Sequence, residues 1–365
     1  MKKLKILRVC TFPTINRPTI GLHASELCNI NLATTILLTH NDNLDRPKIE
    51  GDFRLFEFGK PFELRLPKEE QKIFTEFFFI IRRIFGILKF SLYGVWLLFY
   101  NKVDIIHIHS PMYIIIAIVG FFAKKKIYIT FHGADFHRIK KSLWYKLCSK
   151  IFTKVFSLSP FFIPTLSKIH GEDKVTFVHN GIDQDIYKNL NIVRKKQIIA
   201  VAQFKVEKGL KYLIEAFSNL KKNDFFKEYV LLIIGDGNLR KELENQIQFL
   251  GMRNHIYLPG KKKQNELIDL FNQSEVFALS SLREGFPKVL LEAISCGCKI
   301  VSTDCDSANI ILKGIKLAQP GSSEDLTNEL SNSITSKNKF NIDISKFTWD
   351  SLRKIYYDEY NKINL

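Results

Sequence analysis

Short apolar runs rich in Ile and Val recur along the chain and alternate with amphipathic stretches. In the first half, these strand-like runs occupy 4–12, 34–39, 53–58, 104–109, 126–131, 154–158 and 174–178. The pattern restarts after residue 190, where 196–204 and 229–237 are strand-like and amphipathic helices follow them. Strands that alternate with helices indicate βαβ units, and such apolar strands are typical of parallel sheets covered on both faces. We therefore predict an α/β protein with two doubly wound, Rossmann-like domains.

The length of 365 residues also favours two domains, because a single core rarely grows that large. A polar, charged connection near 184–195 separates the two halves of the pattern. We predict an N-terminal domain over 1–185, a second domain over 190–345, and a C-terminal helix over 346–365 that returns to the first domain. Ligands of such sheets bind beyond the carboxyl ends of the strands, so two domains that face each other would share a cleft there.

The formal net charge of +17 favours anionic partners, such as nucleotide phosphates, nucleic acid or acidic lipid. We expect no nucleic-acid partner, because the chain has no recognition motif and no strands that combine basic and aromatic residues. The first apolar run is broken by Lys5 and Arg8, which indicates a buried strand rather than a signal peptide. The six cysteines form no CxxC pair, as expected of free thiols in a reducing compartment. These features predict a cytoplasmic protein.

The stretch 280–297, SSLREGFPKVLLEAISCG, places Glu284 and Glu292 on either side of a Gly-Phe-Pro turn. Pro287 suits the first turn of a helix, so Glu284 would precede that helix and Glu292 would lie inside it. The start of a helix offers N–H groups to an anion, and the two carboxylates can accept hydrogen bonds from sugar hydroxyls and a ribose diol. The spacing alone fits equally a capped amphipathic helix with two solvated glutamates.

This stretch resembles the signature of glycosyltransferase family four, a retaining family with the GT-B fold, which has a segment like EGFxxVLLEAMACG. The resemblance implies that Glu284 contacts hydroxyls of the donor sugar at the reacting centre and that Glu292 contacts the ribose. The N–H groups of Gly285 and Phe286 would help to hold the sugar and phosphate. It further implies a UDP- or GDP-sugar as donor substrate, with no metal and no other cofactor.

Residues 201–217, VAQFKVEKGLKYLIEAF, resemble the family's VGRLxxEKGxxxLIxAF, where an Arg and a Lys bind the donor diphosphate. Lys208 matches the Lys, which implies a catalytic role in offsetting charge on the departing nucleotide. Gln203 stands at the position of the Arg; it can donate a hydrogen bond but supplies no cation. Lys205 is a nearby cation, and whether it compensates for this loss stays open.

Residues 231–244, LLIIGDGNLRKELE, resemble the family's strand–GDGP–helix segment, which implies that Gly235 and Gly237 lie close to the nucleotide base. Alone, GDG is a common turn. Residues 302–312, STDCDSANIIL, lack the family's usual Gly-Gly-x-x-Glu ending. This departure leaves open the geometry of that loop and the choice of donor.

In the first half, TFHGADF at 130–136 resembles the family's TxHGxD and implies that His132 lies beside the donor sugar and orients the reacting centre. A polar residue at a strand end is the alternative. DIIHIHSP at 104–111 resembles DVVHxHxP; its histidines share one face of a strand, but no carboxylate or Cys set completes a metal site. Gly21, in PTIGLHASEL, is the candidate for backbone contact with the diphosphate. HNGIDQDIY at 179–187 resembles PNGVDxxxF and indicates a structural turn.

Residues 73–100 are aromatic and apolar and contain Arg82, Arg83 and Lys89. Two interpretations fit this stretch: a pair of buried helices packed on the first sheet, or a basic apolar helix in the membrane interface. Its longest uncharged run, 90–101, is too short to span a bilayer. We expect peripheral binding to an anionic membrane on the inner face of the plasma membrane, and a glycan or lipid-linked acceptor in bacterial surface polysaccharide synthesis.

Three other functions remain open at this point. A nucleotide-sugar epimerase of the same architecture would need a donor and no acceptor. A basic module that binds nucleic acid without catalysis is allowed by the charge alone. A degenerate, inactive transferase is suggested by Gln203 and by the missing glycine pairs.

Overall fold

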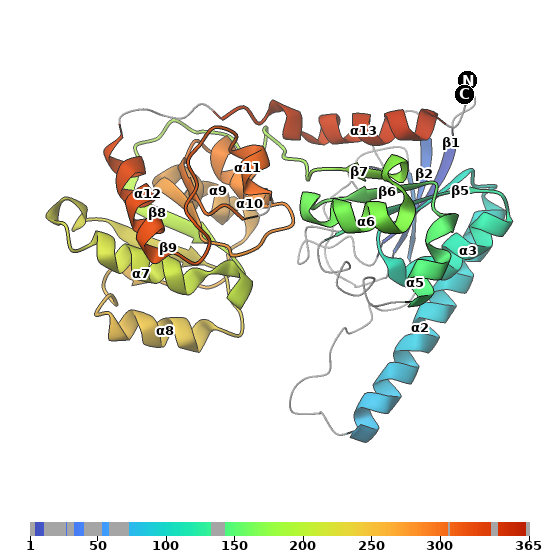
Figure 1. The fold of residues 1–365 in the computed structure, drawn as a ribbon, viewed down its shortest axis with the longest axis horizontal. Helices are drawn as coiled ribbons and strands as arrows, with labels where there is room; N and C mark the ends of the chain where they lie inside the picture. Colours follow the sequence, from blue (N-terminus) through green and yellow to red (C-terminus); the bar gives the residue numbers. More distant parts are fainter. Residues whose placement is uncertain are drawn as a thin grey trace. The chain divides into compact units, whose positions relative to one another are not determined.

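The computed structural model describes residues 4–10, 27, 33–39, 53–57, 73–132, 143–305, 307–336 and 342–362. The chain divides into two compact units, which are described separately here (Figure 1). Unit 1 comprises Met1–Asn180 together with Asp350–Leu365, and unit 2 comprises Gly181–Trp349. The division therefore falls inside the predicted turn at 179–187, and it assigns the C-terminal helix to the first unit.

The described part of unit 1 is built on a parallel sheet of strand order β3-β2-β1-β4-β5-β6-β7. Its strands are β1 (Leu4–Val9), β2 (Ala33–Thr39), β3 (Phe53–Glu57), β4 (Ile105–Ile108), β5 (Lys126–Phe131), β6 (Lys154–Ser157) and β7 (Val175–Phe177). Each lies within two residues of a predicted strand, except that β1 ends three residues earlier than predicted. The order reverses between β1 and β4, so this is a doubly wound sheet with a switch point there.

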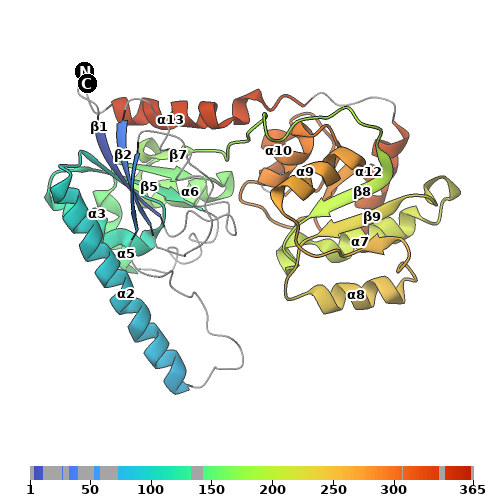
Figure 2. The same ribbon diagram turned by 180° about the vertical axis from the view of Figure 1, so that it is seen from behind.

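Alternate residues of these strands face opposite sides of the sheet, as the period of two requires. Leu7, Ile106 and Ile129 join the core beneath the helices α2 (Ile73–Tyr100), α3 (Ile114–Phe122), α5 (Leu143–Cys148) and α6 (Ile163–His170). The neighbouring positions, Arg8 and His107 among them, face α13 (Trp349–Asn361) on the other side. The helix α13 lies along this face of the sheet in both views (Figures 1 and 2).

Residues 73–100 form one continuous helix, α2, so the first of the two interpretations, a pair of buried helices, is wrong. One side of α2 packs on the sheet through Phe90, Leu97 and Leu98, all of which are buried. A pair would need a turn, whereas Gly94, inside α2, is a close packing point. Within the described residues, no helix has the length and apolarity that crossing a membrane requires.

The described part of unit 2 is built on a second parallel sheet, of order β10-β9-β8-β11-β12. Its strands are β8 (Lys195–Val201), β9 (Val230–Ile234), β10 (Ile256–Tyr257), β11 (Ser274–Leu279) and β12 (Lys299–Ser302). Its helices are α7 (Leu210–Leu220), α8 (Arg240–Phe249), α9 (Gln264–Gln273), α10 (Lys288–Ser295), α11 (Ala308–Ile311) and α12 (Ser323–Thr335). The order reverses between β8 and β11, which places the switch point of this sheet between the loops that follow those two strands.

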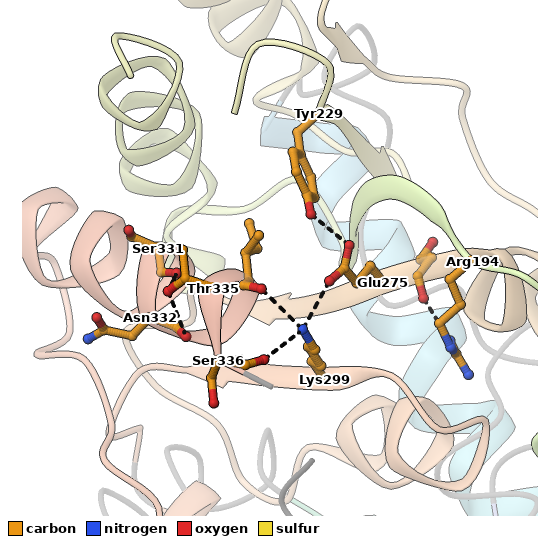
Figure 3. Close-up of polar contacts among 10 residues, drawn as sticks. Arg194, Tyr229, Glu275, Lys299, Ser331, Asn332, Thr335 and Ser336 are labelled. Atoms are coloured by element: carbon orange, nitrogen blue, oxygen red, sulfur yellow. Dashed lines mark hydrogen bonds and ion pairs between the residues drawn. The ribbon is translucent and has the colours of Figure 1, made fainter. Parts of the chain in front are cut away.

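Polar groups also tie the amino ends of the strands of unit 2 together (Figure 3). Glu275, at the start of β11, accepts a hydrogen bond from the Tyr229 hydroxyl at 2.7 Å and pairs with the Lys299 ammonium at 3.0 Å. Lys299 also donates to the carbonyls of Ile334 and Ser336, at the end of α12. These contacts fix the end of α12 to the amino ends of the strands. The sequence motifs lie at the opposite, carboxyl ends.

Candidate functional site

The loops that follow β8 and β11 meet at the switch point of unit 2. The Leu282 N–H donates to the Glu207 carbonyl at 2.8 Å, and the Ser280 hydroxyl donates to the Lys208 carbonyl at 3.0 Å. Gly209 has a φ of 60°, and a Cβ there would lie 2.1 Å from the Ser280 carbonyl oxygen. The EKG sequence therefore needs its glycine because the two loops approach each other backbone to backbone.

Lys208 and Glu284 form an ion pair between these loops, with Nζ 2.6 Å from Oε1. Their side chains are 22% and 13% exposed, so the pair is shielded but still reached by solvent. The Ser281 hydroxyl donates to the same carboxylate oxygen at 2.7 Å. Two of the three residues for which the sequence predicts catalytic roles are thus brought into direct contact, on the carboxyl side of the sheet.

The segment after Glu284 leads directly into α10. Pro287 is the residue before the helix, and α10 begins at Lys288, which confirms the predicted loop–helix arrangement. Phe286 is buried against Phe347, with ring centroids 5.7 Å apart. The Ser307 hydroxyl donates to the Gly285 carbonyl at 2.7 Å. The 302–312 loop without the glycine pair therefore still supports the segment around Glu284.

The turn after β9 lies against the loop after β8. A Cβ on Gly235, whose φ is 140°, would lie 1.8 Å from the Ala202 carbonyl oxygen, and a Cβ on Gly237 would lie 2.5 Å from the Phe204 carbonyl oxygen. Gln203, between those two residues, is exposed at the same strand ends. Both glycines therefore allow this turn to touch the segment that carries Gln203.

Arg240 fixes the same turn. Its Nε lies 2.8 Å from Asp236 Oδ1, Nη2 donates to the Gly235 carbonyl at 3.3 Å, and the guanidinium lies 5.2 Å from the Phe204 ring centroid. The hydrogen bond from Arg240 holds the pKa of the Asp236 carboxyl below its usual value. The cation of Arg240 therefore holds the turn. No sequence motif predicts this role.

Glu292 lies on α10, inside unit 2, and is nearly buried. Its Oε1 is 3.3 Å from the Lys288 ammonium, one helical turn earlier. The Tyr187 hydroxyl also hydrogen bonds to Glu292 and to Gln264, at the start of α9. Burial raises the pKa of Tyr187, and Glu292 adds to this effect. A ring of polar groups thus surrounds the carboxylate that the resemblance assigns to the ribose.

Tyr187 belongs to the segment predicted to be a structural turn, and the structure bears out the turn. The Asp183 carboxylate accepts the N–H groups of Asp185 and Ile186 at 3.0 and 3.1 Å. A Cβ on Gly181 would lie 2.3 Å from the Trp349 ring, so only glycine fits. The signal that could have found Tyr187 is its hydroxyl, since a buried tyrosine usually needs a hydrogen-bond partner.

His132 lies in unit 1, directly after β5, and is 7% exposed. Burial lowers its pKa to about 3, so the ring is neutral at physiological pH. His109 lies next to it, with ring centroids 5.8 Å apart, and stacks in turn on His107 at 4.4 Å. The shared face of His107 and His109 is therefore confirmed.

Two predictions concern parts of the site on which the structure is silent. Gly21 lies outside the described residues. The described residues contain no group of three or more His, Cys, Asp and Glu that could hold a metal ion, but the independence of the reaction from metal stays a prediction.

Known protein families match both halves of the chain. The family described as Glycosyl transferases group 1 matches residues 182–345, which include Lys208, Glu284 and Glu292. The family described as Glycosyltransferase Family 4 matches residues 54–186, which include His132. The chain belongs to the family-four glycosyltransferases. The resemblance found in the sequence motifs is therefore confirmed.

Relatives and solved structures agree with this assignment. The glycosyltransferase is 26% identical over 241 residues to an uncharacterized glycosyltransferase of Methanocaldococcus jannaschii. The aligned region covers 62% of this chain and 64% of the relative. It is 26% identical over 251 residues to the UDP-Gal:alpha-D-GlcNAc-diphosphoundecaprenol alpha-1,3-galactosyltransferase of Escherichia coli, which covers 58% of this chain and 61% of that enzyme. The match thus spans less than two thirds of either relative.

The crystal structure of Anabaena HepE in complex with UDP and glucose matches the glycosyltransferase with a TM-score of 0.73 and 16% identity, over 98% of this chain and 99% of that one. At this identity the likeness concerns the fold alone. It confirms the predicted α/β fold class, with two Rossmann-like domains of the GT-B type.

Proposed function

We propose that this glycosyltransferase transfers a hexosyl group from a UDP- or GDP-sugar to a lipid-linked glycan, with retention of anomeric configuration. The observation that carries the proposal is the Lys208–Glu284 ion pair, which joins the loop after β8 to the loop before α10. The pair combines a cation for the diphosphate with a carboxylate for sugar hydroxyls. The first N–H groups of α10 add a partial positive charge nearby, which favours an anionic ligand.

The departing nucleotide places extra negative charge on phosphate while the sugar becomes oxocarbenium-like. A fixed cation or hydrogen-bond donor aimed at that charge contributes about 3–4 kcal/mol in a closed site. We infer that Lys208 turns from Glu284 to the diphosphate when donor binds, which leaves Glu284 available to sugar hydroxyls. Ser281 then keeps the carboxylate in place through its hydrogen bond. The Gln203 amide adds a donor at the same strand ends.

The names of similar proteins support the donor and acceptor classes. The Escherichia coli relative acts with UDP-Gal on a diphosphoundecaprenol-linked sugar, and the Anabaena structure holds UDP and glucose. We extend this to a lipid-linked acceptor for the present chain and to a role in bacterial surface polysaccharide synthesis. Glycosyl transfer would take place at the cytoplasmic face of the plasma membrane, where lipid-linked glycans are accessible to a peripheral protein.

The test starts with a thermal-shift screen of UDP- and GDP-sugars. A donor at about 100 times its Kd stabilises the folded protein by about 2.7 kcal/mol, which raises the melting temperature by several degrees. The donor so found is then incubated with a polyprenyl-diphosphate-linked sugar, and the anomeric configuration of the product is read by NMR. An inverted product contradicts retention, and the absence of any stabilising nucleotide-sugar contradicts the donor assignment.

A nucleotide-sugar epimerase is distinguished by the same reagents. Such an enzyme converts the donor when no acceptor is present, whereas the proposed transferase leaves the sugar unchanged apart from slow hydrolysis. Conversion of the donor alone to an isomer would replace the transferase proposal.

A further inference from the structure

The helix α2 has two different apolar sides. The inward side carries Phe90, Leu97 and Leu98, which are buried in the core of unit 1. At Gly94 the packing is so close that a Cβ would lie 2.5 Å from Ile116 Cδ1 of α3 and 3.0 Å from Leu38 Cδ2 of β2. The carboxyl half of α2 is therefore fixed to the sheet and to α3. This packing also determines which side of the helix faces outward.

The outward side is also apolar. Its members are between 41% and 67% exposed: Ile84, Phe85, Leu88, Leu92, Trp96, Phe99 and Tyr100. At 100° per residue, the side chains from Ile84 to Phe99 fall within an arc of about 120°. We call these seven residues the α2 stripe. Trp96 stacks on Tyr93 and Tyr100, with ring centroids 5.5 and 4.8 Å apart, which gives the stripe a continuous aromatic end.

Such a stripe is unusual on a helix of a globular protein, where the outward side is normally charged or polar. The amino-terminal part of α2 also runs beyond the other labelled elements of unit 1, in both views (Figures 1 and 2). Nothing in the described part of unit 1 covers the stripe, as the exposed fractions of its side chains show. An apolar surface of this size marks an interaction site.

Basic residues border the stripe. Arg82 and Lys89 are exposed on α2 at one margin, and Lys102 and Lys124 are exposed in the turns where α2 and α3 end. From the start of α2 at residue 73 to residue 132 the chain contains seven Lys and Arg and two acidic residues, Glu76 and Asp104, and the Asp104 carboxylate accepts the Lys5 N–H at 2.9 Å. The surroundings of the stripe are therefore strongly positive.

This charge decides among the possible occupants. A second copy of the chain would bring the same basic residues into the contact, and the like charges would oppose it. An anionic bilayer offers acidic headgroups to the basic margin and acyl chains to the aromatic stripe. The buried inward side of α2 also means that the helix cannot leave the fold to span a bilayer.

We propose that α2 docks unit 1 on an anionic phospholipid membrane, with the α2 stripe inserted among the lipids and the basic margin at the headgroups. The inference deepens the membrane location included in the proposed function, but it does not depend on which sugar is transferred. It names the surface that brings the enzyme to a lipid-linked acceptor.

The test is flotation of the full chain with vesicles of phosphatidylcholine alone or with 30% phosphatidylglycerol. We expect the wild-type chain to float with the anionic vesicles at low salt, and much less with the neutral ones. The triple variant Phe85→Ser, Leu92→Ser, Phe99→Ser should lower the partition coefficient at least about tenfold, because three apolar side chains no longer enter the lipid. The double variant Arg82→Glu, Lys89→Glu should lower it to a similar extent, through lost attraction to acidic lipid.

Matched controls come from unit 2. The triple variant Val193→Ser, Phe225→Ser, Phe249→Ser removes apolar side chains that are at least as exposed as the three that are replaced in the stripe. The double variant Lys241→Glu, Lys313→Glu makes the same charge change at exposed positions. Both controls should float like the wild-type chain.

Each other outcome overturns the inference. It fails if the stripe variants float as well as the wild-type chain, or if the controls lose as much flotation as the stripe variants do. It fails in favour of a second copy if light scattering shows a dimer that the Phe85, Leu92, Phe99 variant converts to a monomer. Donor-dependent thermal stabilisation, measured on the same variants, should be unchanged; its absence in every chain would count against the proposed function and not against the docking surface.

Discussion

In unit 1, the polar side chains Arg8, His107 and Thr130 lie on the central strands and are completely buried beneath α13. In unit 2, Lys208 and Glu284 lie in loops beyond the strand ends and remain partly exposed. The first group is held by contacts that no ligand can reach. The second group consists of two opposite charges that a charged ligand can separate. Parallel sheets of the same kind thus use polar residues for structure in one unit and, according to the proposed function, for ligand binding in the other.

The hydrogen bonds of the buried group are specific. The Tyr360 hydroxyl lies 2.6 Å from His107 Nδ1 and accepts from Arg8 Nη1 at 3.0 Å. His107 Nε2 lies 2.8 Å from the Thr130 hydroxyl, which is 2.9 Å from the Tyr356 hydroxyl. Replacing members of either group should therefore separate effects on stability from effects on turnover.

The largest effect is expected for Lys208→Ala. Turnover should fall about 10²–10³-fold, because the cation that offsets charge on the departing nucleotide is lost from a shielded site. The melting temperature should change little, since a partly exposed ion pair contributes little to stability. Steady-state kinetics and a thermal melt measure the two quantities. Lys241→Ala, at an exposed position on α8, is the control. If Lys208→Ala kept wild-type turnover, the proposed difference between structural polar residues in unit 1 and ligand-binding residues in unit 2 would be contradicted.

Acid should destabilise unit 1 through its buried histidines. Burial lowers the pKa of His132 to about 3 and that of His170 to about 4, whereas both titrate near 6.5 when the chain is unfolded. The unfolded chain therefore binds more protons between these values, and stability falls as the pH drops below about 6.5. Each histidine contributes up to about 1.4 kcal/mol per pH unit between pH 4 and 6.

Denaturant melts at pH 7, 6, 5 and 4 measure this slope. The variants His132→Gln and His170→Gln should each flatten it, whereas His255→Gln, at a half-buried position, should change it less. Identical slopes in all four proteins would show that neither buried ring resists protonation as its burial implies.

Tyr360→Phe tests the structural role of the buried group. The variant removes one hydroxyl that bonds to both Arg8 and His107, and leaves them buried without it. We expect a loss of about 1–3 kcal/mol in the free energy of unfolding, because the two hydrogen bonds of this hydroxyl are lost, whereas the contact between Arg8 Nη1 and His107 Nδ1 at 2.9 Å remains. Thermal stabilisation by donor should persist. A variant that keeps the wild-type free energy of unfolding but no longer binds donor would assign this group to ligand binding.

The smallest effect is expected for Tyr187→Phe. Glu292 would lose the tyrosine hydroxyl while it keeps Lys288, so the carboxylate would be positioned less well for the ribose. The loss of about 1 kcal/mol corresponds to a fivefold rise in the KM for donor, with kcat little changed. The matched control is Tyr257→Phe, at an exposed position, which should behave like wild type. A fall in kcat with unchanged KM would contradict a positioning role.

The sequence was sufficient to place most of the fold because its signals are local. Ile- and Val-rich runs locate strands such as β5 and β9, and Pro287 locates the start of α10. The predicted strand 196–204 was too long, since β8 ends at Val201. The apolar residues that follow serve the loop instead, where Phe204 packs beneath Arg240. A periodic pattern cannot distinguish these two uses.

The partners of the site residues could not be predicted in the same way. The motif spacing indicates that Lys208 and Glu284 belong to one site, but not that they pair with each other in the free protein. Contacts such as Tyr187 with Glu292 join segments far apart in the chain, and no local period records them. For α2, composition left a buried pair and an interfacial helix open, and only its packing at Gly94 shows which side faces outward.

Unit 2 is one uninterrupted stretch of chain, whereas unit 1 is assembled from both ends of the sequence. The two ends of unit 2 lie together, because the Ile182 N–H donates to the Phe347 carbonyl at 2.9 Å and Gly181 lies against the Trp349 ring. During synthesis, the strands that carry Arg8 and His107 are therefore made first, and they remain without the tyrosines of α13 until all of unit 2 has been made. A nonsense mutation that deletes only this last helix would leave the earliest-made strands without their cover.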